Sequence, residues 1–168
     1  MSENFSVSPG GEKFLLPKPE DYKNEFDRLK KIVEKERSEG REIVVVMGVG
    51  FVGAVMAAIV ADTVDKKTGK ASKFVIGMQR PSARSYWKIP LLNRGISPVK
   101  AEDPEVDPMI ERCVNAKKTL IATYSHEVLK FADVVVVDVQ CDYIKEELGN
   151  VRNGRTDMAA LESSIGVI

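Results

Sequence analysis

One uncharged stretch constrains the fold of this 168-residue chain more than any other feature. Residues 43–61, IVVVMGVGFVGAVMAAIVA, contain no charged side chain over 19 positions. The first five are mostly β-branched and typical of a buried strand, whereas the last eight are typical of a helix built from small residues. The stretch is also about as long as a membrane-spanning helix. We favour a strand, a glycine turn and a buried helix, because each glycine would cost a continuous helix about 1 kcal/mol.

The glycines of this stretch form the pattern GxGxxG, directly after the predicted strand and at the start of the predicted helix. In a dinucleotide-binding turn the first glycine makes the tight turn, the second admits a pyrophosphate, and the third lets the helix approach the strand. The helix N-terminus then directs free N–H groups and its positive dipole end at the phosphates. We therefore predict that Gly48, Gly50, Phe51, Val52 and Gly53 bind a dinucleotide cofactor.

After Gly40 the chain alternates between β-rich and helical segments. Predicted strands cover 43–47, 73–78, 119–123 and 133–139, and predicted helices cover 52–65, a stretch within 84–94, 108–116, 125–131 and the residues from 158 onward. This alternation is typical of βαβ units and of a parallel sheet with helices on both faces. The expected fold class is α/β, a Rossmann-type doubly wound domain over residues 41–168.

The first 40 residues divide into two parts. Residues 1–18 have no periodicity and are predicted to be a flexible or loosely docked arm. Residues 19–40 are predicted to form an amphipathic helix that ends at Gly40. Its apolar positions are Tyr22, Phe26, Leu29, Ile32 and Val33. This stripe either packs on the chain's own domain or serves as a partner-binding or dimerisation face.

The overall charge excludes some partners. The chain has 25 Lys and Arg against 25 Asp and Glu, and no local basic stripe, so we expect no nucleic-acid partner. Because a strand, a glycine turn and a buried helix explain residues 43–61, we also expect no membrane span. Cys113 and Cys141 lack CxxC or CxxH spacing, which predicts neither a disulfide framework nor a metal site. The N-terminus lacks a secretory profile. A reducing, cytoplasmic location is therefore expected.

The residues after the second predicted strand leave the choice of cofactor open. An Asp or Glu at this place accepts hydrogen bonds from the ribose hydroxyls of NAD. This chain has Gln79 and Arg80 instead. Gln79 can still form a hydrogen bond with a ribose hydroxyl, whereas Arg80, with Ser82 or Arg84, can hold the 2′-phosphate of NADP. Arg80 can also face solvent or stack on adenine, and Tyr86–Trp87 either stack on adenine or cover the sheet edge.

Several segments, in order, resemble one enzyme family. They are 46–53 (VMGVGFVG), 92–98 (LNRGISP) with Glu102, 123–125 (TYS), 132–134 (ADV) and 154–158 (GRTDM). Together they resemble the N-terminal part of the nucleotide-sugar dehydrogenases, which act on UDP-glucose, GDP-mannose or UDP-N-acetylmannosamine. The resemblance covers residues 43–168. It makes NAD the expected cofactor, and it implies contacts to that cofactor from Thr123, Val139 and Cys141, the last standing where the family has a threonine.

The resemblance implies a four-electron oxidation used in polysaccharide biosynthesis. The C6 hydroxyl of a nucleotide sugar becomes a carboxylate through two hydride transfers to NAD and a thioester on a cysteine. That cysteine and its assisting lysine lie beyond the first domain in the family. We therefore expect no catalytic residue in this chain, which looks truncated and inactive alone, with the sugar nucleotide bound by the missing part and a homodimer formed by the full-length protein.

Two alternatives remain at this stage. One is a stand-alone dinucleotide-binding regulatory module without catalysis. The other is a different Rossmann oxidoreductase, but the chain lacks a Tyr-xxx-Lys pair or a paired His and Asp. Its single histidine, His126, follows the predicted N-cap Ser125 and is expected to be a surface or cap residue rather than a general base.

Overall fold

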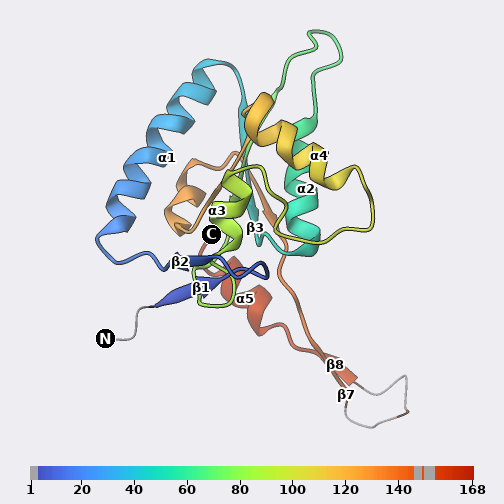
Figure 1. The fold of residues 1–168 in the computed structure, drawn as a ribbon. Helices are drawn as coiled ribbons and strands as arrows, with labels where there is room; N and C mark the ends of the chain where they lie inside the picture. Colours follow the sequence, from blue (N-terminus) through green and yellow to red (C-terminus); the bar gives the residue numbers. More distant parts are fainter. Residues whose placement is uncertain (1–3, 146–148, 150–153) are drawn as a thin grey trace.

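A four-stranded parallel sheet forms the centre of the molecule (Figure 1). The computed structural model describes residues 4–145, 149 and 154–168. The strands are β3 (Glu42–Met47), β4 (Lys73–Met78), β5 (Leu120–Thr123) and β6 (Val134–Val137), in the spatial order β5-β4-β3-β6. The four predicted strands are confirmed, with ends shifted by one or two residues. The order of strands reverses between β3 and β6, which is the topological switch point of a doubly wound sheet.

The register aligns the carboxyl ends of all four strands. Met47 pairs with Met78 on one side and with Val137 on the other, and Met78 pairs with Thr123. The side chains and loops that follow these residues therefore gather along one edge of the sheet. In open α/β sheets this edge is where ligands bind.

One face of the sheet is covered by helices that follow β3 and β4. These are α2 (Phe51–Asp62), α3 (Lys88–Asn93), α4 (Val106–Glu111) and a π-helical turn, η1 (Arg112–Ala116). The buried side of α2 consists of one glycine and four alanines, so its backbone lies close to the strands. Residues 43–61 are thus divided between β3, a turn and α2, and no helix in the described part of the chain is long and apolar enough to cross a membrane.

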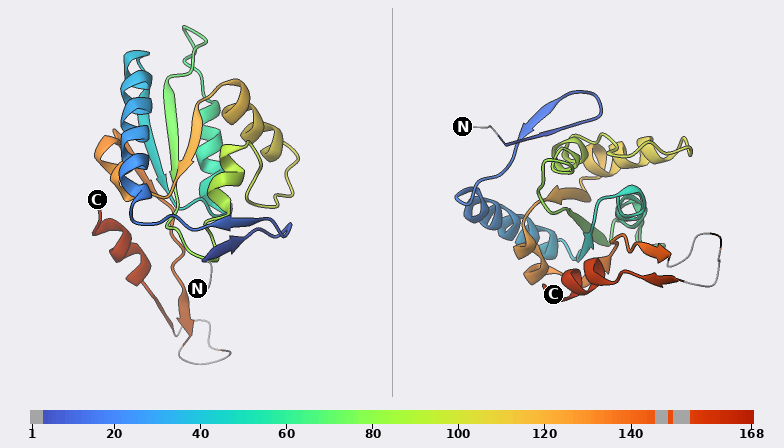
Figure 2. Two further views of the ribbon diagram at one scale, coloured as in Figure 1. Left: turned by 60° about the vertical axis from the view of Figure 1, so that its left-hand side comes forward. Right: turned by 90° about the horizontal axis from the view of Figure 1, so that it is seen from below.

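The opposite face is covered by α1 (Asp21–Ser38) and the 3₁₀ helix η2 (His126–Phe131), as the two views of Figure 2 show. Leu29 and Val33 of α1 are buried against alternate strand residues, including Ile43 and Val45. The apolar stripe of α1 therefore packs on the chain's own sheet, the first of the two alternatives. Helices on both faces confirm the doubly wound class.

At the far end of α2, a network of charges joins it to η1. The Asp62 carboxylate accepts two hydrogen bonds from the Arg112 guanidinium, at 3.0 and 2.8 Å, and one from Lys117 Nζ at 2.7 Å. These cations lower the pKa of Asp62 well below its usual range, the hydrogen bonds from Arg112 having the largest effect. The carboxylate therefore stabilises the fold in its charged form.

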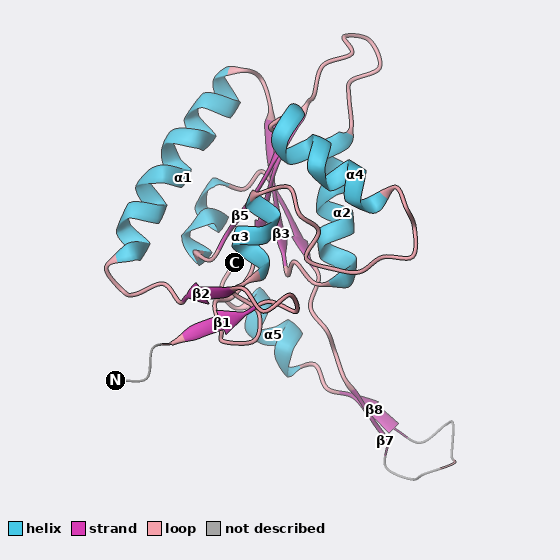
Figure 3. Ribbon diagram, in the orientation of Figure 1, coloured by secondary structure: helices cyan, strands magenta, loops and turns pink. Residues whose placement is uncertain are grey.

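The N-terminal residues differ from the flexible arm that we expected. Strands β1 (Phe5–Val7) and β2 (Lys13–Leu15) form an antiparallel hairpin (Figure 3). Ser6 is fully buried, and its hydroxyl accepts a hydrogen bond from the backbone N–H of Trp87 at 3.1 Å. Glu12 pairs with Arg94 at 2.8 Å. These partners lie 81 and 82 residues away in sequence, so the local composition of the arm could not indicate them.

The C-terminal segment also differs from expectation. The strand predicted to reach residue 139 ends at Val137, and a second antiparallel hairpin follows from β7 (Tyr143–Lys145) and β8 (Gly154–Thr156). It projects away from the sheet (Figure 1), and helix α5 (Ala159–Ile165) then returns toward the sheet. Residues 154–156, which belong to a segment that resembles the dehydrogenase family, form a strand because they pair with 143–145.

Candidate functional site

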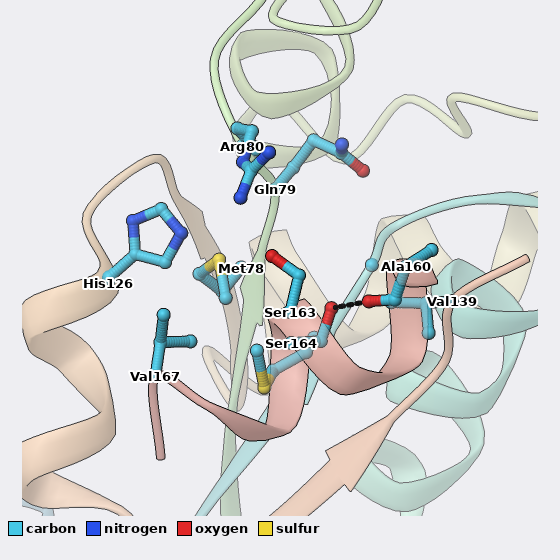
Figure 4. Close-up of a pocket in the computed structure, with 11 residues that line it drawn as sticks. Met78, Gln79, Arg80, His126, Val139, Ala160, Ser163, Ser164 and Val167 are labelled. Carbon is cyan, nitrogen blue, oxygen red and sulfur yellow. Dashed lines mark hydrogen bonds between the residues drawn. The ribbon is translucent and has the colours of Figure 1, made fainter. Parts of the chain in front are cut away.

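A pocket of about 210 Å³ lies at the carboxyl edge of the sheet, beside the switch point (Figure 4). Its walls come from the ends of β3 and β4, the start of η2, the residue two positions after β6, and α5. The residues that line it are Met47, Gly48, Met78, Gln79, Arg80, His126, Val139, Ala160, Ser163, Ser164 and Val167. Four predicted cofactor contacts, Gly48, Gln79, Arg80 and Val139, are therefore brought together around one space.

Two of the three motif glycines are required by close packing. Gly48 has a φ of +98°, and a Cβ on it would lie 2.0 Å from the Asp138 carbonyl oxygen. A Cβ on Gly53 would lie 1.9 Å from the Gly48 carbonyl oxygen and 2.6 Å from Asp138 Oδ2. Because the blocking atoms are mainly backbone, they cannot rotate away. Gly48 thus permits the turn, and Gly53 lets α2 lie against the turn and β6.

The middle glycine is different, because open space surrounds it. A Cβ on Gly50 would meet no atom within 4 Å, so packing within this chain does not require a glycine there. Gly50 is the N-cap residue of α2, and Phe51 and Val52 in the first turn are 61% and 53% exposed. The first turn of α2 is therefore accessible from outside. The turn thus fits a diphosphate, which needs N–H donors and a close approach to the backbone.

Gln79 contacts the glycine turn directly. The Val49 N–H donates a hydrogen bond to Gln79 Oε1 at 3.1 Å, which ties the end of β4 to the turn after β3. The next residue, Arg80, is exposed, and no described carboxylate lies within ion-pair distance of its guanidinium. Gln79 therefore has a structural role at the turn, and Arg80 carries an unpaired positive charge beside it.

His126, at the start of η2, lines the pocket, although the sequence suggested only a surface or cap position. Its pKa is lowered, first by burial and then by the positive charge of Arg80. The imidazole is therefore mainly neutral at pH 7 in the free protein. The signal that points to this residue is its position three residues after the end of β5, at the edge where ligands bind.

Helix α5 supplies the remaining wall of the pocket. The Ser164 hydroxyl donates to the Ala160 carbonyl at 2.8 Å, within the helix. Ser163 Oγ is on the side of the pocket toward Arg80 in Figure 4. A helix from residue 158 onward was predicted, and α5 confirms it. Its contribution to the pocket was not predicted, because the β7–β8 hairpin separates it from the sheet along the chain.

Thr123 and Cys141 do not line the pocket. Thr123 is fully buried, and its hydroxyl donates to Glu25 Oε1 of α1 at 2.5 Å. In this structure the Thr123 hydroxyl is bound by Glu25 of α1 and does not reach the pocket, so its predicted cofactor contact stays a prediction. Cys141 is partly exposed, four residues beyond the end of β6. Both cysteines are free thiols, and burial raises the pKa of Cys113 to about 11.

The aromatic residues after β4 cover the sheet edge, the second of the alternatives for them. Tyr86 meets Tyr124 edge-on at 6.0 Å between ring centroids, and Tyr124 meets Tyr22 of α1 at 5.2 Å. The Trp87 side chain is buried, and its Nε1–H donates to the Arg84 carbonyl at 3.0 Å. These contacts anchor α1 and the loop after β4 next to the pocket.

Comparisons with known proteins agree with this geometry. The solved NDP-N-acetyl-D-galactosaminuronic acid dehydrogenase from Methanosarcina mazei Go1 matches 83% of this chain at 28% sequence identity, with a TM-score of 0.62. The resemblance to the nucleotide-sugar dehydrogenases is confirmed. A UDP-glucose dehydrogenase from the hyperthermophilic archaeon Pyrobaculum islandicum matches 76% of the chain at 18% identity, with a TM-score of 0.54, and supports the fold alone.

The similarity concerns one part of those enzymes. The chain covers 26% of the Methanosarcina dehydrogenase and 24% of the Pyrobaculum dehydrogenase, about a quarter of each. No protein-family model matches the chain, and no curated protein sequence matches it. The chain is therefore similar to a partial region of these dehydrogenases.

Proposed function

We propose that this chain is the cofactor-binding N-terminal domain of a nucleotide-sugar 6-dehydrogenase. The complete enzyme would oxidise the C6 hydroxyl of a UDP- or GDP-sugar to a carboxylate, and the resemblance favours NAD as its cofactor. The observation that carries the proposal is the contrast between the glycines: Gly48 and Gly53 are required by packing, whereas Gly50 borders open space at the start of α2. Packing within the chain does not explain a glycine at position 50, whereas a diphosphate bound against the backbone would.

In this proposal the first turn of α2 holds the diphosphate through its backbone N–H groups, and Gly50 leaves room for it. The resemblance assigns Val139 and Cys141, beyond the end of β6, to the nicotinamide half. The bound nicotinamide supplies the hydride acceptor for alcohol oxidation. The protein's own part is to bind and orient the cofactor at the switch point of the sheet.

Substrate binding and catalysis are assigned to parts of the enzyme outside this chain. The sugar nucleotide would bind mainly there, and a homodimer would form in the complete protein. Within the chain, Cys113 is buried and its raised pKa keeps the thiol protonated, so it does not act as the covalent nucleophile. We therefore propose that the chain binds cofactor but does not oxidise sugar nucleotides by itself.

The proposal is tested by replacing Gly50 with valine. The Gly50→Val chain should fold normally, because nothing within 4 Å opposes a Cβ, and its side chain should fill the space required by the diphosphate. Calorimetric titrations with NADH and NADPH should show binding to the parent chain and at least a tenfold loss for the variant, about 1.4 kcal/mol. Thermal melting checks that both are folded.

Gly10→Val is a matched control, because Gly10 lies in the distant β1–β2 turn and a Cβ there makes only ordinary contact, at 3.8 Å from Ser8 Oγ. This variant should bind both dinucleotides like the parent. If Gly50→Val also binds them like the parent, the assignment of the glycine turn is wrong.

A further inference from the structure

The end of β4 lacks the acceptor that an unphosphorylated ribose requires. An acidic side chain at this position normally accepts hydrogen bonds from the ribose hydroxyls of NAD. No residue that lines the described pocket is acidic, and Gln79 stands at the expected place. Its Oε1 is already an acceptor for the Val49 N–H at 3.1 Å. Gln79 is therefore held by the glycine turn and is a poor substitute for a carboxylate.

The same pocket is instead suited to an anion. In Figure 4 the Arg80 guanidinium points toward the side of the pocket where His126 and Ser163 lie. These three side chains supply a fixed positive charge, a ring that can become positive and a hydroxyl donor. The acidic residue that follows His126 in sequence, Glu127, forms an ion pair with Lys130. Within the described residues nothing acidic neutralises Arg80.

Arg80 differs in this respect from other arginines that have ordered roles in the fold. Arg94 pairs with Glu12 at 2.8 Å, and Arg112 pairs with Asp62 at 2.8 Å. Arg80 has no such partner among the described residues and lines a pocket, so its charge is available to a ligand. Planar arginine side chains bind phosphate oxygens through paired, charge-assisted hydrogen bonds.

The size of the pocket also fits a part of a ligand rather than a whole one. Its volume is about 210 Å³, below the roughly 300–1,000 Å³ of a complete small-molecule site. It adjoins Gly48 of the turn and the end of β4, where the adenosine ribose of a dinucleotide lies in this fold. The part of the ligand that reaches Arg80 is therefore the ribose and any group attached to it.

We infer that the Arg80 side of this pocket, away from Val139, receives the 2′-phosphate of NADP, so that the chain binds NADP in preference to NAD. The inference rests on the proposed function, because it needs a dinucleotide whose diphosphate lies on the turn at Gly50. Arg80 pairs with the phosphate, and His126 and Ser163 complete its surroundings. The unphosphorylated ribose of NAD finds no carboxylate there. The preference is thus opposite to the one that the resemblance alone implies.

The test compares NADPH with NADH in calorimetric titrations of the parent chain and two variants. The parent should bind NADPH at least tenfold more tightly than NADH. Arg80→Ala should weaken NADPH about 10- to 100-fold, the usual value of a charged hydrogen bond, and leave NADH within twofold. Lys66→Ala is the matched control, because Lys66 is an exposed cation in the loop between α2 and β4 and does not line the pocket. It should change neither affinity by more than twofold.

A second pair of probes isolates the adenosine half. Adenosine 2′,5′-bisphosphate should bind more tightly than 5′-AMP, and Arg80→Ala should remove the difference. Equal or tighter binding of NADH by the parent would overturn the inference and leave the proposed function standing. So would an equal loss of both dinucleotides in Arg80→Ala. Failure of the parent to bind either dinucleotide would overturn the proposed function as well.

Discussion

Replacing Gly53 with alanine tests whether the close contact of α2 with the turn is as tight as the structure indicates. The new Cβ would lie 1.9 Å from the Gly48 carbonyl oxygen, about 1.5 Å short of the 3.4 Å at which ordinary contact begins. It would also lie 2.6 Å from Asp138 Oδ2. The Asp138 carboxylate can rotate, but the carbonyl belongs to a turn whose Gly48 is itself packed against β6. The start of α2 must therefore move.

The expected cost follows from two opposing effects. Overpacking of this kind destabilises a protein by about 1–3 kcal/mol, and a backbone obstacle places Gly53→Ala at the upper end. Alanine in place of a helical glycine returns about 1 kcal/mol. We expect a net loss of about 2 kcal/mol in the free energy of unfolding. For a chain of this size that corresponds to a decrease of about 4–8 °C in Tm.

Urea denaturation followed by circular dichroism measures this change, with thermal melting as a second readout. Gly50→Ala is the control, because it adds the same methyl group to the same motif where no atom lies within 4 Å. It should alter the free energy of unfolding by no more than about 0.5 kcal/mol. A Gly53→Ala chain as stable as the parent would refute the close approach of α2 and with it the geometry assigned to the turn.

Two further predictions concern residues outside the pocket. Asp62→Asn should lower the free energy of unfolding by about 1–2 kcal/mol at pH 7, because it removes the charge that Arg112 and Lys117 bind in this partly exposed network. Since the folded pKa of Asp62 is lowered, this stabilisation is present above the unfolded pKa of about 3.9 and is lost as pH falls below it. Urea titrations should therefore show the free energies of unfolding of parent and variant converging at low pH. A constant difference between them down to pH 2 would contradict the network. In the native chain iodoacetamide should modify Cys141 much faster than Cys113 at pH 8, because Cys113 is buried with a pKa raised to about 11, and mass spectrometry of peptides would reveal the opposite order if that burial were wrong.

Local patterns in the sequence predicted the part of the fold that carries the site. The β-branched run, the three glycines and the alanine-rich segment specify β3, the turn and α2, because each pattern acts within a few residues. The same holds for the other three strands of the sheet. The arrangement of Gly48, Gln79, Arg80 and Val139 around one pocket then follows from the parallel order of strands.

The features that sequence reasoning missed depend on contacts between distant residues. The Thr123 hydroxyl donates its hydrogen bond to Glu25, which is 98 residues away in sequence. The β1–β2 hairpin is anchored by Trp87 through a single buried serine hydroxyl. His126 and helix α5 reach the pocket only because the sheet and the β7–β8 hairpin place them there. Apart from the position of His126 after β5, a single sequence carries no local signal for these contacts.

The most direct test of the account is to map where a dinucleotide binds. Two-dimensional ¹H–¹⁵N NMR spectra of the isotope-labelled chain, recorded during a titration with NADPH, report on each backbone amide. The account predicts that the largest shift changes occur at Gly50, Phe51 and Val52 in the first turn of α2, followed by Arg80 at the end of β4. Shift changes elsewhere with none at the first turn of α2 would contradict it.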